Sequence, residues 1–226
     1  RMAEANNQPD DQTKTSSSSS ESDIVRGRLE RAAIAINQAL LLNKTNQFEQ
    51  ARQQLANAEA ELESLNAGGR NVEVTARLAK TRMELGQQLL MLNLLSDSVE
   101  KLRSAVKTYQ ALSTQSPDHP PYLEGLAAAR LALANAFRAL GRDGDVIETY
   151  EAAIRDYDLL LKARPGVPYY IESLAIVRTD LAQALSLIGN NHAAKEQAAQ
   201  SLAQFLDLVN AHADVHRYHE EHATTM

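Results

Sequence analysis

The sequence matches itself when it is displaced by 48 residues, and this internal repeat restricts the possible fold more than any other feature. The displacement places Tyr122 over Tyr170 and Tyr218, and Leu126 over Leu174. Further matches at this offset are Arg82/Arg130/Arg178, Leu85/Leu133/Leu181, Gln87/Asn135/Gln183, Leu92/Leu140/Ile188, Tyr109/Tyr157/Phe205 and Leu112/Leu160/Leu208. Self-similarity at a fixed period is typical of stacked supersecondary units. We therefore expect a repeat array.

The composition of the chain indicates that the repeated units are helical. Ala and Leu dominate the apolar residues, whereas aromatic residues make up only 4% of the chain. Ala, Leu, Gln, Glu and Arg lose little side-chain freedom in a helix and are strong helix formers. The alternating Val-, Ile- and Thr-rich runs that indicate strands are missing. The predicted fold class is all-α.

Each unit is predicted to contain two helices joined by a tight turn. Prolines that suit a first helical turn open two of the units, at Pro120 and Pro168. Gly141 and Gly189 follow an apolar stripe, and a glycine there predicts a left-handed residue that ends the first helix. Side-chain oxygens of Asp143 and Asn191 are predicted to cap the second helix.

The repeat frame divides the chain into a linker, four helix pairs and a terminal stub. Residues 1–22 are polar and Ser-rich, and they contain too little apolar surface to offset the entropy of ordering, so we expect a disordered linker. The expected helix pairs cover about 23–67, 70–115, 119–164 and 167–211, and a helix stub covers 214–226. The first pair fits with a two-residue shift, with Asn46 and Glu49 as a capping box. The opening Arg1-Met2 suggests a fragment of a longer protein.

The segment Leu133-Ala134-x-x-Phe137-x-x-x-Gly141, followed by Tyr150, Ala153 and Pro165, resembles the tetratricopeptide repeat (TPR). The repeat is 48 residues long rather than the family's ~34, and arginine stands at the family's usual Trp position. The Pro-x-Tyr-x-x-x-Leu-Ala opening is similar to repeats attached to bacterial serine/threonine kinases and signalling proteins. The resemblance implies a right-handed superhelical stack of antiparallel helix hairpins, a TPR-like α-solenoid. It also implies a protein or peptide partner and favours a bacterial cytoplasm or periplasm.

In the tetratricopeptide family, the first helix of each pair lines a concave binding face. The matching positions are Met83, Gln87, Leu90, Met91, Leu131, Asn135, Arg138, Thr179, Gln183 and Ser186. The repeated amide of Gln87, Asn135 and Gln183 could pair with a partner backbone, or it could be solvated or bonded inside the repeat. The apolar members could receive an amphipathic helix, or they could pack on a neighbouring repeat. The lysines and arginines of the family's carboxylate clamp are missing, because Met83, Leu131 and Thr179 stand in their places.

A row of arginines, Arg82, Arg130 and Arg178, recurs at the repeat period. Arginine binds phosphate and carboxylate groups bidentately, which would suit an acidic or phosphorylated ligand. Glutamates recur in the same frame six residues earlier, at Glu124 and Glu172. We favour the second interpretation, in which these rows pair between stacked repeats as a structural ladder.

The sequence carries few signals of other functions. The net charge is −6 with both signs interspersed, which argues against nucleic-acid binding, and no apolar run is long enough for direct membrane insertion. His216, His219 and His222 would share a helix face and are weak candidates for metal ligands. We expect no cofactor and a non-enzymatic scaffold that binds a partner protein, as the regulatory part of a signalling protein. The alternative is a self-assembly element that forms a homo-oligomer through an open C-terminal end; a metal-dependent enzyme is less favoured.

Overall fold

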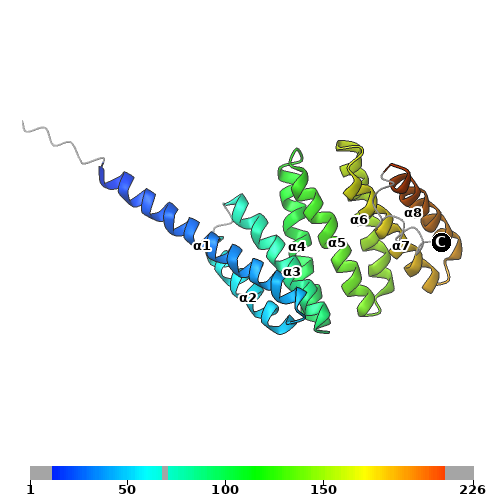
Figure 1. Cartoon of the computed structure of the whole chain (residues 1–226), viewed down its shortest axis with the longest axis horizontal. Helices are drawn as coiled ribbons and strands as arrows, with labels where there is room; N and C mark the ends of the chain where they lie inside the picture. Colours follow the sequence, from blue (N-terminus) through cyan, green and yellow to red (C-terminus); the bar gives the residue numbers. More distant parts are fainter. Residues whose placement is uncertain (1–11, 68–70, 212–226) are drawn as a thin grey trace, which may run out of the picture.

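The computed structural model describes residues 12–67 and 71–211, and within these ranges it contains eight α-helices and no strand. The helices are α1 (Gln12–Lys44), α2 (Phe48–Leu65), α3 (Val72–Met91), α4 (Leu95–Gln115), α5 (Pro120–Ala139), α6 (Asp143–Ala163), α7 (Pro168–Leu187) and α8 (Asn191–Ala211). Figure 1 shows them as a row of hairpins in which helices adjacent in sequence are neighbours in space. The predicted all-α repeat stack is confirmed.

The helix starts reproduce the period of the sequence. Val72, Pro120 and Pro168 open α3, α5 and α7 at intervals of 48 residues, and α4, α6 and α8 begin at the same interval. The second helix of the first pair, α2, begins at Phe48, which is 47 residues before the start of α4 at Leu95. The first pair is therefore one residue out of frame, whereas the sequence comparison gave a shift of two.

A left-handed residue ends the turn inside every hairpin. Asn46, Asn93, Gly141 and Gly189 have φ angles of 58°, 59°, 68° and 80°. The two glycines behave as predicted, because glycine adopts this conformation without a steric penalty. Asn46 was predicted to cap α2, and this is wrong: it is the left-handed residue, and the N-cap position falls on Gln47 without a side-chain cap bond.

The predicted caps of α6 and α8 are also one residue out of place. The residue directly after the left-handed glycine already occupies the cap position, so the turn is tighter than expected. In α6 this residue is Arg142, which makes no side-chain cap bond, and Asp143 is the first helical residue. Before α8, the Oδ1 atom of Asn190 rather than Asn191 accepts a bond from the backbone N–H of Ala193, at 3.4 Å.

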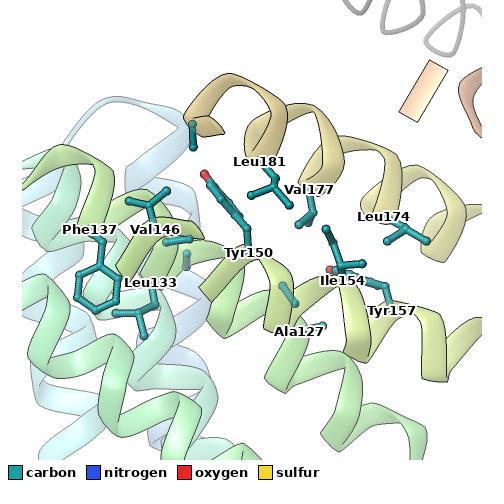
Figure 2. Close-up of a cluster of buried hydrophobic side chains, with 14 of the residues drawn as sticks. Ala127, Leu133, Phe137, Val146, Tyr150, Ile154, Tyr157, Leu174, Val177 and Leu181 are labelled. Atoms are coloured by element: carbon teal, nitrogen blue, oxygen red, sulfur yellow. The ribbon is translucent and has the colours of Figure 1, made fainter. Parts of the chain in front are cut away.

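A buried cluster runs from α4 to α8 and joins the hairpins. Figure 2 shows Tyr150 and Tyr157 of α6 among Leu174, Val177 and Leu181 of α7, and all five side chains are at most 2% exposed. Each fully buried side chain of this size contributes about 1.5–3 kcal/mol to folding. Because the apolar face of one hairpin is covered by the next, the stack is held together by contacts between consecutive hairpins.

Two glycines allow adjacent helices to approach closely. A Cβ atom on Gly125 of α5 would lie 2.4 Å from Cε1 of Tyr109 on α4, and a Cβ on Gly86 of α3 would lie 2.6 Å from Cγ of Leu102. At the second crossing the Ser98 hydroxyl also donates a 2.7 Å bond to the Gly86 carbonyl. These contacts fix the position of α4 between α3 and α5.

The N-terminal helix extends into the region that was expected to be a linker. α1 begins at Gln12, so residues 12–22 are helical. Figure 1 shows this part of α1 projecting beyond α2 and α3. The structural reason is continuity with the part of α1 that packs on α2, since adding residues to an existing helix costs less than starting one. Residues 1–11 and the stub at 214–226 lie outside the described residues.

Candidate functional site

The apolar side chains expected on a binding face are partly used in packing. Met83, Leu90 and Leu131 are half-buried and lie against the buried cluster that joins α4 to α8. Met83 also contacts the smaller cluster formed around Tyr109. Met91, at the end of α3, remains 59% exposed. The structure therefore brings three of the four into the contacts between repeats and leaves Met91 available to a partner.

The repeated amide does not have the same environment in each repeat. Gln87 and Gln183 are exposed, whereas Asn135 is half-buried. The Oδ1 atom of Asn135 accepts a 2.7 Å bond from the Tyr150 hydroxyl and a 2.9 Å bond from Nη2 of Arg138. Burial raises the pKa of the Tyr150 hydroxyl, which keeps it protonated as a donor. Asn135 is therefore bonded inside its own hairpin.

Arg138 connects two consecutive first helices. Its Nη1 atom on α5 lies 3.6 Å from Oδ1 of Asp180 on α7. Burial raises the pKa of the Asp180 carboxyl, and the Arg138 guanidinium partly opposes this rise. Arg138 is nevertheless exposed, with 42% of its side chain accessible. It can contact a partner while it holds Asp180.

The three predicted residues of α7 gather at one groove. Thr179, Gln183 and Ser186 line a depression of about 310 Å³ between α7 and α8, together with Ala182, Ala194, Lys195 and Ala198. The Thr179 hydroxyl is already engaged, because it donates to the Ala175 carbonyl at 3.1 Å and lies 2.8 Å from the Ser201 hydroxyl. Gln183 and Ser186 are exposed. We name the exposed members Gln87, Met91, Arg138, Gln183 and Ser186 the first-helix face.

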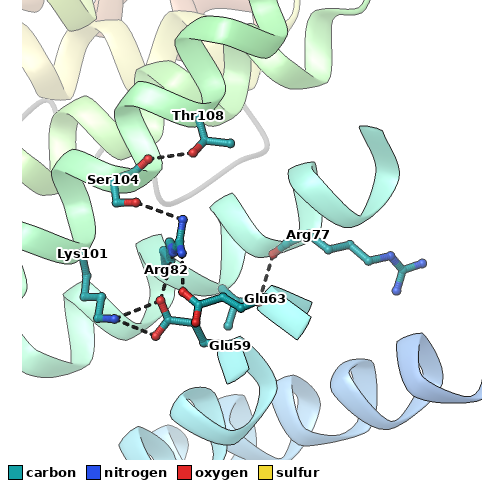
Figure 3. Close-up of polar contacts among 8 residues, drawn as sticks. Glu59, Glu63, Arg77, Arg82, Lys101, Ser104 and Thr108 are labelled. Atoms are coloured by element: carbon teal, nitrogen blue, oxygen red, sulfur yellow. Dashed lines mark hydrogen bonds and ion pairs between the residues drawn. The ribbon is translucent and has the colours of Figure 1, made fainter. Parts of the chain in front are cut away.

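The arginine row forms structural contacts, which the second interpretation predicted. Figure 3 shows Arg82 of α3 between α2 and α4. Its Nε atom donates to Glu59 at 3.0 Å, Nη1 donates to the Ser104 hydroxyl at 3.0 Å, and Nη2 donates to Glu63. Lys101 of α4 also donates to Glu59, at 2.8 and 3.0 Å. Because the side chain of Glu59 is only 7% exposed, this network satisfies a buried charge at the junction of two hairpins.

The other two arginines occupy corresponding positions with different partners. Arg130 donates to Asp156 of α6 and to Gln110 of α4. Arg178 donates to Gln197 of α8 at 2.9 Å. The glutamate row was expected to pair with these arginines, but Glu124 instead accepts a bond from the Tyr170 hydroxyl of the next hairpin. The sequence frame therefore identified the ladder but not its acidic members, which lie on the second helices.

A pocket that the sequence reasoning missed lies between α6, α7 and α8. Its volume is about 510 Å³, within the range of typical binding pockets. Its apolar walls are Ile147, Ile154, Leu181, Leu185, Ile188 and Ala193. Its polar lining is Glu151, Arg155, Arg178, Asn190 and Gln197. A signal was present in the repeat frame, because Phe137 is replaced by the smaller Leu185 at this place.

Two other kinds of site were searched for in the described part of the chain. Residues 12–67 and 71–211 contain no group of three or more His, Asp and Glu side chains arranged to hold a metal ion. The weak metal candidates His216, His219 and His222 lie outside these residues. None of the described helices is both long and apolar enough to cross a membrane.

Comparisons with known proteins identify the fold. The sequence matches no protein-family model and no curated protein. Among solved structures, BtubC (BKLC) from P. vanneervenii matches with a TM-score of 0.53 and 18% identity over 71% of this chain. This chain spans 58% of that protein's length. A putative kinesin light chain of Podosopora anserina, with nearly identical TPR-like repeats, matches with a TM-score of 0.52 and 18% identity, covering 83% of this chain and 77% of that one.

These likenesses agree with the geometry described above. The described residues form helix hairpins at a constant interval, each packed on the next, and two solved repeat proteins superpose on most of them. Sequence identity of 18% carries the likeness of the fold alone. The chain has the fold of a TPR-type helical repeat protein.

Proposed function

We propose that this chain is a non-enzymatic scaffold that binds a partner protein through the first-helix face. The observation that supports the proposal is the repeated exposure of side chains on α3, α5 and α7 at matching positions of consecutive hairpins. A stack of hairpins offers an extended surface that a peptide or helix can follow over several repeats. In the repeat proteins attached to bacterial kinases that the sequence resembles, such a surface would serve regulation, and we propose a signalling role here.

The chemistry of the first-helix face suits a partner with both apolar and polar groups. Met91 supplies a flexible apolar side chain, which adapts to different partner shapes. Gln87 and Gln183 each carry a donor and an acceptor for a partner's backbone. Arg138 adds one cation whose local carboxylate, Asp180, is already held at 3.6 Å. An amphipathic segment with an acidic residue matches this set.

Site-specific crosslinking tests the proposal. A photoreactive amino acid is placed at Met91 or Gln183 in the full chain, which is exposed to cell extract and irradiated. The control position is Leu159 on α6, which is 52% exposed but does not belong to the first-helix face. We expect one partner band from positions 91 and 183 that is absent from position 159. Equal labelling from all three positions, or labelling from 159 alone, would place the interface elsewhere.

Self-assembly is a second candidate, supported by the groove between α7 and α8. Ala182 and Ala194 line this groove and are each 8% exposed, whereas the matching Ala134 and Val146 one hairpin earlier are 0% and 1% exposed. A helix of a second copy could cover these positions. Light scattering at two protein concentrations distinguishes the candidates, because a mass that stays monomeric at both concentrations contradicts self-assembly.

A further inference from the structure

The pocket between α6, α7 and α8 has an internal counterpart one hairpin earlier. Each helix around it begins 48 residues after its equivalent, so α4, α5 and α6 surround the corresponding place. There the ring of Phe137 is 3% exposed. The guanidinium carbon of Arg103 lies 5.2 Å from the centroid of this ring, and that of Arg142 lies 4.8 Å from it. An aromatic ring and two cations occupy the earlier place.

The three residues of this aromatic and cationic group are replaced at the pocket. Phe137 becomes Leu185, Arg103 becomes Glu151, and Arg142 becomes Asn190. Each replacement is shorter than the residue it replaces, and Arg103 to Glu151 also reverses the charge. Removing a ring and two long side chains from one place in a repeat leaves space that the backbone does not close.

The remaining walls keep their character, so the space retains the shape of a side-chain site. The apolar pairs at the two places are Val99/Ile147, Val106/Ile154, Leu133/Leu181 and Leu140/Ile188. Lys107 and Arg130 are likewise matched by the cations Arg155 and Arg178. Leu181 and Leu185 are 2% and 6% exposed, whereas Ile188 at the rim is 49% exposed. The result is an apolar floor that opens to solvent.

The charges at the rim are available to a ligand. Glu151 and Arg155 are exposed. Within the part of the chain that the structure describes, no ion pair or hydrogen bond engages the Glu151 carboxylate. Arg178 is held by Gln197 and lies 3.8 Å from Asp158. A cation of a partner would therefore find Glu151 unpaired, next to an apolar floor.

We propose that this pocket receives a large apolar or aromatic side chain from a partner protein, with a basic residue of the same partner segment paired to Glu151. The partner would supply the ring and the cation that this chain supplies itself one hairpin earlier. The lining residues on α6 run from Ile147 to Arg155, a length of ~12 Å at 1.5 Å per residue, which matches about two turns of a partner helix. The inference deepens the proposed function and rests on it.

The test uses the full chain and a display library of random peptides. In the filled variant, Leu185→Phe, Glu151→Arg and Asn190→Arg restore the group that occupies the earlier place. The control variant is Glu148→Arg, which makes the same charge change at an exposed position of α6 outside the pocket. Peptides selected on the unmodified chain are synthesised with a fluorescent label, and their dissociation constants are measured by fluorescence anisotropy.

We expect the selected peptides to contain an aromatic or large aliphatic residue and a Lys or Arg within one helical turn of it. Binding to the filled variant should weaken at least about tenfold, and binding to Glu148→Arg should change by less than about twofold. If the filled variant loses its helical circular dichroism, Glu151→Arg alone replaces it, since this residue is exposed. That single change should weaken basic peptides and strengthen peptides in which the basic residue is replaced by Glu.

Two results would overturn the inference. One is a selection without enriched peptides, and the other is equal binding to the unmodified chain and to the filled and Glu151→Arg variants. Neither result refutes the proposed function, because crosslinking from Met91 and Gln183 would still report a partner on the first-helix face. Loss of those crosslinks with retained pocket binding would instead refute the first-helix face and leave the pocket.

Discussion

Replacing Gly125 by alanine tests whether α4 and α5 pack as closely as the structure shows. The added Cβ would lie 2.4 Å from Cε1, 2.5 Å from Cζ and 2.8 Å from Cδ1 of Tyr109. Ordinary contacts of this kind begin at 3.4 Å. The Tyr109 ring would therefore have to move by about 1 Å, yet it is only 6% exposed and packed on all sides.

The expected cost follows from two opposing terms. Overpacking of a well-filled core costs about 1–3 kcal/mol, and a direct contact with ring atoms belongs near the upper end. Alanine returns about 1 kcal/mol because it favours the helix more than glycine does. We expect the free energy of unfolding of Gly125→Ala to fall by about 1–2 kcal/mol.

A second glycine provides the matched control. Gly144 lies in the first turn of α6, and a Cβ atom there would meet nothing within 4 Å. Gly144→Ala should therefore raise the free energy of unfolding by about 0.5 kcal/mol through helix propensity alone. Urea denaturation followed by far-ultraviolet circular dichroism measures both changes. Equal stabilisation by the two substitutions would refute the close packing of α4 on α5.

Three further substitutions test the polar contacts. Asn135→Ala removes the acceptor of the buried Tyr150 hydroxyl, and urea denaturation should show a loss of about 1–3 kcal/mol. Arg82→Met leaves Glu59 with Lys101 as its remaining cation, and we expect a loss of about 2 kcal/mol in the same assay. Burial raises the pKa of the Glu84 carboxyl, so its ionised form is disfavoured in the folded state. Glu84→Gln should therefore be more stable than the unmodified chain at neutral pH, and this difference should shrink as pH falls through the raised pKa; a difference independent of pH contradicts this reasoning.

Much of the fold could be predicted because the repeat is written directly in the sequence. Pro120 and Pro168 mark helix starts, and Gly141 and Gly189 mark turns, since each of these residues restricts the backbone locally. The start of α1 could not be predicted in this way, because a polar segment carries no local signal that separates a linker from the extension of a helix.

The roles of individual side chains depend on neighbours that the sequence does not place. Asn135 has the same repeat position as Gln87 and Gln183, but only Asn135 has a tyrosine hydroxyl within reach. The residue at the equivalent of Tyr150 in the last hairpin is Ala198, which has no hydroxyl to donate. A repeat position therefore predicts location along a helix, whereas the function of a side chain depends on what the second helix presents to it.

The central claim is that the hairpins repeat in space at the interval at which they repeat in sequence, and distances between spin labels test it most directly. Glu100, Glu148 and Glu196 are exposed, lie on α4, α6 and α8, and are separated by 48 residues. The chain contains no cysteine, so pairs of cysteines introduced at these sites can be labelled selectively. Pulsed electron paramagnetic resonance should give similar distances for the pairs 100–148 and 148–196 and a clearly longer distance for 100–196. A distance for 100–196 no longer than the two single steps would indicate a closed bundle and contradict the account.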